Sequence, residues 1–316
     1  MFMKATIIGA GAVGSTIAFS LATHGTASEI VLIDINEEKA KGEAMDILQG
    51  SPFFGSMSII AGGYPDAVDS DFVIITSGIP RKPGQSRLEL AQTNVNIMKD
   101  IATQISKYAP NAIYIIVSNP VDVMTYAFHK FSGIPENRII GSGTILDSAR
   151  YCAKLAEIYE TSQGNVNAYI FGEHGDSSFA VWSLANIAGV SLEQYQERYG
   201  EKIKSFPAYD RAEVEDFVKK SGGIIIGRKG ATNYAIAVSV AYIVRTIVTG
   251  MNTAMTVSTM LHGQYGLDGV CLSTLAIVGK NGVEGLVEAP LTEDELARLN
   301  KSAENLKSVI HSLNLD

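Results

Sequence analysis

A strand-like segment, "ATII", leads directly into the glycine-rich turn "GAGAVG" of residues 9–14 and then into a helical run, "STIAFSLATHG". This order constrains the fold, because it places a tight turn and a helix N-terminus at the end of a strand, where a pyrophosphate can bind. Gly9 permits the turn, Gly11 lets backbone N–H groups approach the phosphates, and Gly14 allows the helix to pack closely on the sheet. Asp34 ends the next strand-like run, "EIVLID", where a carboxylate can bind an adenosine ribose and repel a 2′-phosphate. The pattern predicts a dinucleotide site that prefers NAD to NADP.

Short β-branched runs alternate with segments of helical spacing over the first half of the chain. The runs are "KATIIG", "EIVLID", "DFVIIT", "AIYIIVSNP" and "RIIGSG". Such alternation is typical of βαβ units and a parallel sheet. After about Gly143 the helical stretches lengthen. We therefore expect an α/β protein with a doubly wound Rossmann sheet in residues 1–143 and an α+β catalytic domain in residues 144–316.

The second half ends in a strongly amphipathic segment. Thr292 and Glu295 have the spacing of a capping box, which marks a helix start. The apolar face of the predicted terminal helix comprises Leu296, Leu299, Ala303, Leu306, Ile310 and Leu313. Strand candidates in this half include "NAYIFG" and "VCLSTLAIVGK".

Composition excludes several classes of function. The net charge is -8 and no long Lys/Arg run occurs, so a nucleic-acid-binding surface is not expected. Cys152 and Cys271 are the only cysteines and lie far apart, which argues against a disulfide framework or a zinc ribbon. Glycines interrupt the apolar N-terminal run, so neither a signal peptide nor a membrane span is predicted. We expect a cytoplasmic protein with no metal site.

One histidine stands in a setting that favours catalysis. His174 lies in "GEHGDS", between two glycines and directly after a strand-like run, and histidine exchanges protons near neutral pH. The other four histidines are interpreted as structural. In "LDSAR", Asp147 and Arg150 stand at i and i+3, so a carboxylate and a guanidinium project from one helical face.

These motifs carry a family resemblance over nearly the whole chain. "GAGAVG", "SNPVD", "LDSAR", "GEHGDS" and "KGATNYAIA" occur in the order of the NAD-dependent lactate/malate dehydrogenase family, which the sequence resembles. The resemblance implies that His174 is the general acid/base, oriented by Asp147. Arg150 would bind the substrate's C1 carboxylate, and Arg87, on a mobile loop, would polarise the reacting carbonyl. A planar guanidinium suits the first role because it can bond both carboxylate oxygens.

The remaining site residues follow from the same resemblance. Asn119 would contact both nicotinamide and substrate, and Thr232 would lie in the substrate site. The expected cofactor contacts are Gly9, Gly11, Val13, Gly14, Asp34, Thr76, Gly78, Asn94, Val117 and Asn119.

Arg81, six residues before Arg87, bears on substrate choice. Lactate enzymes of the family typically have glutamine at this position and malate enzymes arginine, so we expect Arg81 to bind the distal carboxylate of oxaloacetate. A malate dehydrogenase is the first expectation. L-lactate dehydrogenase is the alternative, since "GEHGDS", "LDSAR" and Thr232 resemble the lactate branch more closely.

Other expectations concern regulation and assembly. Members activated by fructose-1,6-bisphosphate have an arginine and a histidine where this chain has Cys152 and Asn167, so no activation is expected. A homotetramer, or a dimer, is the family expectation.

Two functions of other classes are less consistent with the sequence. A non-catalytic NAD-sensing module would not need Asp147, Arg150 and His174 together. An NAD-dependent glycosidase would need a metal held by Cys and His.

Overall fold

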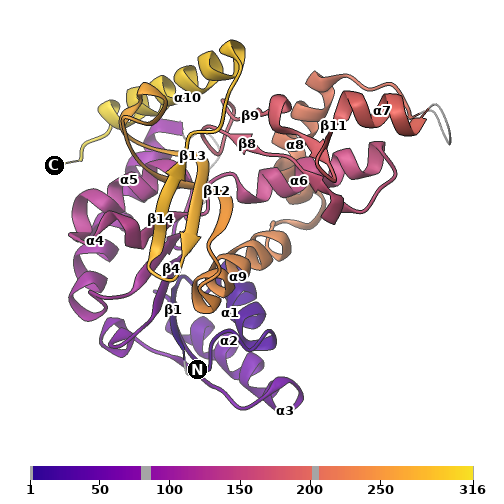
Figure 1. The fold of residues 1–316 in the computed structure, drawn as a ribbon. Helices are drawn as coiled ribbons and strands as arrows, with labels where there is room; N and C mark the ends of the chain where they lie inside the picture. The colour runs from indigo at the N-terminus through magenta and orange to yellow at the C-terminus, as the bar shows by residue number, and fades with distance from the viewer. Residues whose placement is uncertain (1–2, 80–86, 201–205, 316) are drawn as a thin grey trace.

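The computed structural model describes residues 3–79, 87–200 and 206–315, and a nine-stranded sheet runs through this part of the chain (Figure 1). The strand order is β3-β2-β1-β4-β5-β6-β12-β13-β14. The first six strands are parallel: β1 (Lys4–Ile8), β2 (Glu29–Ile33), β3 (Ser58–Ala61), β4 (Phe72–Ile75), β5 (Ile113–Ile116) and β6 (Ile139–Gly141). The order reverses between β1 and β4, where a doubly wound sheet opens a crevice at its carboxyl edge. The predicted Rossmann architecture is confirmed.

The parallel strands are apolar throughout because both faces of the sheet are covered. In β4, Phe72 and Ile74 join one hydrophobic core, while Val73 and Ile75 join the other. Helices α1 (Ala12–Thr23), α2 (Glu37–Gln49) and α9 (Tyr234–Thr249) cover the first face. Helices α4 (Arg87–Tyr108), α5 (Val121–Ser132) and α10 (Glu293–Ser312) cover the second. Burial on both sides explains the β-branched runs.

Strands from the second half extend this sheet. β12 (Thr253–His262), β13 (Asp268–Gly279) and β14 (Gly282–Val287) form an antiparallel meander, and β12 pairs with β6 at Ser258 and Gly141. The sheet therefore crosses the expected division at residues 143/144, which remains a prediction.

The rest of the second half forms a separate core around α6 (Ile145–Ile158) and α8 (Arg211–Lys229). Tyr151 and Leu155 of α6 are fully buried in it, with Val218 of α8 nearly so. The short elements here are α7 (Leu192–Gly200), a sheet of β7 (Val166–Asn167), β10 (Asn186–Ile187) and β11 (Val190–Ser191), and a pair of β8 (Ile170–Phe171) and β9 (Phe179–Ala180). Another short helix, α3 (Ser51–Phe54), follows α2.

The terminal helix α10 begins as predicted. Thr292 Oγ1 accepts a hydrogen bond from the Glu295 amide at 3.3 Å, and Glu295 Oε2 accepts one from the Thr292 amide at 2.9 Å. The expected apolar face is buried except for Leu296, which is half-buried. Glu295 is more deeply buried than Leu296, because its carboxylate also anchors Ser183 through the amide, at 3.0 Å, and the hydroxyl, at 2.6 Å.

Candidate active site

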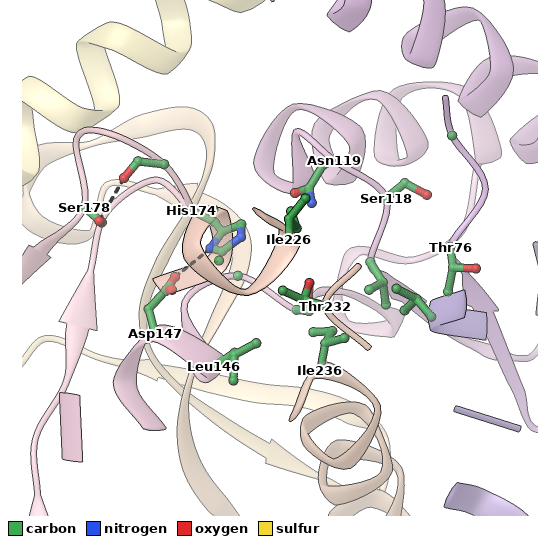
Figure 2. Close-up of a pocket in the computed structure, with 18 of the residues that line it drawn as sticks. Thr76, Ser118, Asn119, Leu146, Asp147, His174, Ser178, Ile226, Thr232 and Ile236 are labelled. Atoms are coloured by element: carbon green, nitrogen blue, oxygen red, sulfur yellow. Dashed lines mark hydrogen bonds and ion pairs between the residues drawn. The ribbon is translucent and has the colours of Figure 1, made fainter. Parts of the chain in front are cut away.

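A cleft of about 620 Å³ opens at the carboxyl edge of the parallel strands. This is the size range of small-molecule sites. Its walls come from the loops after β1, β4 and β5 on one side and from α6, α8 and the His174 loop on the other. Figure 2 shows Thr76 and Ser118 at one end of the cleft, with His174 and Asp147 at the other. The cleft thus joins the two halves of the fold.

The glycine-rich turn has the geometry that its residues predict. Gly9 has φ +105°, a left-handed conformation that favours glycine. A Cβ at Gly14 would lie 1.8 Å from the carbonyl oxygen of Gly9, so a side chain there would force helix and strand apart. Gly11 is the N-cap of α1, and a Cβ there would have no neighbour within 4 Å. Gly11 therefore faces open space at a helix N-terminus, where backbone amides can bind a phosphate.

Asp34 lies at the end of β2, beside this turn. Its Oδ2 accepts a hydrogen bond from the Ala10 amide at 2.7 Å, and its Oδ1 accepts one from the Asn36 amide at 2.8 Å. The carboxylate is half-buried and held rigidly by these amides. A cradle of open amides with a fixed carboxylate beside it fits the diphosphate and ribose of NAD.

The other expected cofactor residues divide into two groups. Those that line the cleft are Gly11, Val13, Thr76, Gly78, Asn94, Val117 and Asn119. Gly9, Gly14 and Asp34 do not line it but support the turn. Asn94 connects two of the cleft loops, since its side chain accepts a hydrogen bond from the Ile79 amide at 2.9 Å and donates one to the Asn119 carbonyl at 2.9 Å.

His174, Asp147 and Arg150 lie close together at one end of the cleft. His174 Nδ1 lies 2.6 Å from Asp147 Oδ2, and Arg150 Nη1 lies 2.8 Å from Asp147 Oδ1. Asp147 is 7% exposed, Arg150 is 15% exposed, and the His174 side chain keeps 30% of its surface open to the cleft. An ionised carboxylate only accepts hydrogen bonds, so Nδ1 carries a hydrogen and Nε2 remains for a reacting group.

The surroundings of His174 favour its protonated form. Burial lowers the pKa of the imidazole, but the charge and hydrogen bond of Asp147, together with the charge of Asp122, raise it above its usual value against the effect of Arg150. The imidazolium is therefore stabilised beside a guanidinium that can bind an anion. The imidazolium can therefore donate a proton to another oxygen atom of a molecule whose carboxylate is bound by the guanidinium.

The loop that carries His174 is held at three successive residues. Gly172 exchanges backbone hydrogen bonds with Ser273 of β13, at 3.0 and 3.2 Å. The Glu173 amide donates to Ser302 Oγ of α10 at 2.8 Å, and the His174 amide donates to Asp122 Oδ2 of α5 at 2.7 Å. Sequence reasoning missed Asp122 and Ser302, although an aspartate inside the apolar run "PVDVMTYAF" is a signal that could have drawn attention to the first.

Further cleft residues come from α8, α9 and the segment between them. Thr232 lines the cleft, as expected for a substrate-site residue. The sequence interpretation did not assign the α8 wall, which comprises Lys219, Gly222, Gly223 and Ile226. A Cβ on Gly222 would lie 3.8 Å from Arg150 Nη2, so this wall lies close to the guanidinium.

Two expected substrate residues cannot be placed in the cleft. Arg81 lies outside the described residues, and Arg87 is the first residue of α4 but its side chain is not described. Among residues 3–79, 87–200 and 206–315, no cluster of three His, Cys, Asp or Glu side chains could hold a metal ion. Over the same residues, no helix is both long enough and apolar enough to cross a membrane.

The dinucleotide turn and the His174 imidazole open into one cleft, and the matching family model is of an NAD-binding dehydrogenase domain, so the protein is an NAD-dependent oxidoreductase. A family model described as "lactate/malate dehydrogenase, NAD binding domain" matches residues 3–141, and one described as "lactate/malate dehydrogenase, alpha/beta C-terminal domain" matches residues 144–314. The chain belongs to the lactate/malate dehydrogenase family.

Curated relatives and solved structures agree with this family. The chain is 46% identical to L-lactate dehydrogenase 1 of Clostridium acetobutylicum over 98% of both chains. It is 45% identical to L-lactate dehydrogenase of Acetivibrio thermocellus over 99% of this chain and 98% of that one. A ligand-bound crystal structure of the minor L-lactate dehydrogenase from Enterococcus mundtii is 36% identical, with a TM-score of 0.94, over 100% of this chain and 99% of that one.

These relatives contradict the expectation of a malate-favoured enzyme. At 45–46% identity over nearly the full length, both curated proteins are named L-lactate dehydrogenase. The expectation depended chiefly on Arg81 and assumed that its charge is enclosed beside the substrate. No described contact supports that assumption, whereas the similarity extends over the residues that build the whole cleft.

Proposed function

We propose that this protein is an L-lactate dehydrogenase, which reduces pyruvate to L-lactate with NADH and catalyses the reverse reaction. The observation that carries the proposal is the full-length similarity to L-lactate dehydrogenases, combined with an Asp147–His174 pair that opens into the cleft. NADH, when bound, supplies the hydride that reduces the carbonyl carbon.

His174 supplies the proton in this proposal. Transfer of a hydride to the carbonyl carbon leaves negative charge on oxygen, and His174 Nε2 donates a proton to that oxygen. Asp147 holds the imidazole in the required tautomer through Nδ1. In lactate oxidation the neutral imidazole takes the proton back.

Cationic and polar side chains bind the substrate. Arg150 bonds the carboxylate with two N–H groups, which fixes the substrate's orientation next to His174. Arg87 stabilises the charge that develops on the carbonyl oxygen, as the family resemblance implies. Asn119 and Thr232 lie along the cleft and complete the site.

The remaining assignments are part of the same proposal. The NAD-binding domain ends near residue 143 and the substrate domain begins at 144. The enzyme is a cytoplasmic homotetramer, with a dimer as the alternative, and the two free cysteines agree with a reducing compartment. Sedimentation analysis over a range of protein concentrations distinguishes the dimer from the tetramer.

The direct test is NADH oxidation by the purified chain. We expect rapid oxidation with pyruvate, and L-lactate as the sole enantiomer in a chiral product assay. Oxaloacetate serves as the comparison substrate. A higher kcat/KM for oxaloacetate, or no turnover of pyruvate, would refute the proposal.

A further inference from the structure

Asp122 is a buried carboxylate directly behind the proposed proton donor. It lies in the first turn of α5 and is 2% exposed. Its Oδ2 accepts a hydrogen bond from the backbone amide of His174 at 2.7 Å. His174 is thus in contact with two carboxylates, with Asp147 at its ring and Asp122 at its main chain.

Asp122 is poorly solvated by its surroundings. Its Oδ1 has no hydrogen-bond partner among the described residues, although it is buried. Ser258 of β12 also acts on the carboxylate, through its side-chain hydroxyl. The buried carboxylate therefore has few polar partners.

Binding a backbone amide does not by itself require a charge. A neutral side-chain oxygen accepts the same hydrogen bond, and burying an ionised carboxylate is costly. Burial raises the pKa of Asp122 to about 6, while Ser258 and the His174 amide lower it. Since the pKa is raised on folding, the carboxylate destabilises the folded chain as pH rises through about 6. The His174 amide is therefore bound by a group with a burial cost that a neutral side chain would avoid.

Resting on the function proposed above, we propose that Asp122 is a positioning residue with two effects on proton transfer: it fixes the His174 main chain, and its negative charge favours the protonated imidazole. Asp147 orients the ring directly. Asp122 acts through the His174 main chain and does not line the cleft.

The neighbouring charges determine the direction of the effect. Among the described residues, the charged groups that act on His174 are Asp147 and Arg150 of α6 and Asp122 of α5. Asp147 and Asp122 favour the imidazolium, whereas burial and Arg150 oppose it. Glu173 beside His174 and Cys271 of β13 also interact with Asp122; Glu173 raises its pKa.

Loss of the Asp122 charge should therefore lower the pKa of His174. Pyruvate reduction needs the protonated imidazole, so its rate falls as pH rises through that pKa. Without the charge, the fall should begin at lower pH. For lactate oxidation, which needs the neutral imidazole, activity should extend to lower pH.

The test is Asp122→Asn, which keeps an oxygen acceptor for the His174 amide and removes the charge. We expect the alkaline limb of kcat/KM for pyruvate to move to lower pH by about one unit, as for loss of a nearby opposite charge. NMR titration of His174, in protein with 13C-labelled histidine and with the signal assigned by His174→Gln, should show a shift of the same size and sign. Asp122→Ser, which offers a neutral hydroxyl, should shift the pH profile and the NMR titration in the same direction as Asp122→Asn.

Glu295→Gln is the matched control, because Glu295 is also a buried carboxylate that binds a backbone amide, but at Ser183. It should leave both titrations unchanged. An unshifted His174 titration in Asp122→Asn, or failure of both Asp122 variants to fold, would assign Asp122 a purely structural role and overturn the proposal. The NMR titration needs no turnover. If the wild type failed to reduce pyruvate, only the function proposed above would fall.

Discussion

The Asp147 carboxylate lies 2.6 Å from Nδ1 of His174 and so determines which ring nitrogen faces the cleft. The same carboxylate binds Arg150 through its other oxygen, at 2.8 Å. One buried aspartate therefore orients both the proposed proton donor and the proposed carboxylate-binding group.

Replacing Asp147 should change the pH dependence of the reaction. Burial of the imidazolium lowers the pKa of His174, and the negative charge of Asp147 raises it. Asp147→Asn removes that charge, so the pKa of His174 should fall. Pyruvate reduction requires protonated His174, so its rate falls as pH rises through that pKa. The alkaline limb of the pH–rate profile should therefore move to lower pH in the variant. Rate measurements from acidic to alkaline pH, with both substrate directions, check this. An unchanged limb would show that Asp147 does not act on His174 electrostatically.

Replacing His174 should separate chemistry from cofactor binding. His174→Gln removes the proton donor, and we expect kcat to fall by about 10²–10⁴-fold. The dissociation constant of NADH, measured by fluorescence titration, should stay within about twofold of the wild-type value, a difference of roughly 0.4 kcal/mol. Near-normal turnover would remove His174 from its proposed role.

Two glycines of the dinucleotide turn should respond differently to alanine. In Gly14→Ala the new Cβ would lie 1.8 Å from the Gly9 carbonyl oxygen, so we expect destabilisation of about 3 kcal/mol. Gly11→Ala meets no atom within 4 Å and should cost about 1 kcal/mol or less.

In the Gly11 variant the methyl group should instead keep the diphosphate away from the amides. We expect its NADH dissociation constant to rise at least about tenfold, which corresponds to about 1.4 kcal/mol. Thermal unfolding and NADH titration of both variants provide the measurements. Equal stability of the two would contradict the close packing at Gly14.

Asp34 should make the enzyme selective for NADH. A 2′-phosphate would be placed against a fixed carboxylate, an unfavourable contact of roughly 3 kcal/mol, so NADH should exceed NADPH in kcat/KM by about a hundredfold or more. Asp34→Asn keeps the shape of the side chain and removes the charge. This substitution should therefore raise kcat/KM for NADPH more than it changes kcat/KM for NADH. Comparable kcat/KM for the two cofactors in the wild type would contradict this role.

Fructose-1,6-bisphosphate should have no effect on the pyruvate saturation curve. The positions that would need cations for phosphate binding hold Cys152, whose thiol lies 3.4 Å from the Ala168 carbonyl oxygen, and Asn167, whose amide binds Asn186 at 3.1 Å. Neither side chain can attract a phosphate by charge. Saturation curves with and without the sugar phosphate provide the test, and a marked fall in KM would reveal another cationic site.

Local sequence patterns were sufficient for much of the fold. The run "GAGAVG" predicts a strand, a turn and a helix because Gly9 and Gly14 have backbone and packing requirements that only glycine meets. The spacing of Asp147 and Arg150 on one helix likewise predicts their ion pair. The short strand β3 was not anticipated, since its four residues, "SIIA", give too little pattern to distinguish a strand from a loop.

The sequence by itself determined the parallel sheet and the dinucleotide turn, and it singled out His174 as the proposed proton donor, because these depend on periodicity and on residues close together in the chain. Tertiary structure alone decided how the histidine is held. Asp122 lies 52 residues from His174, and Ser302 lies 129 residues from Glu173, yet each binds the loop through a backbone amide. Such contacts leave no periodic pattern, since the amide donor is common to nearly every residue.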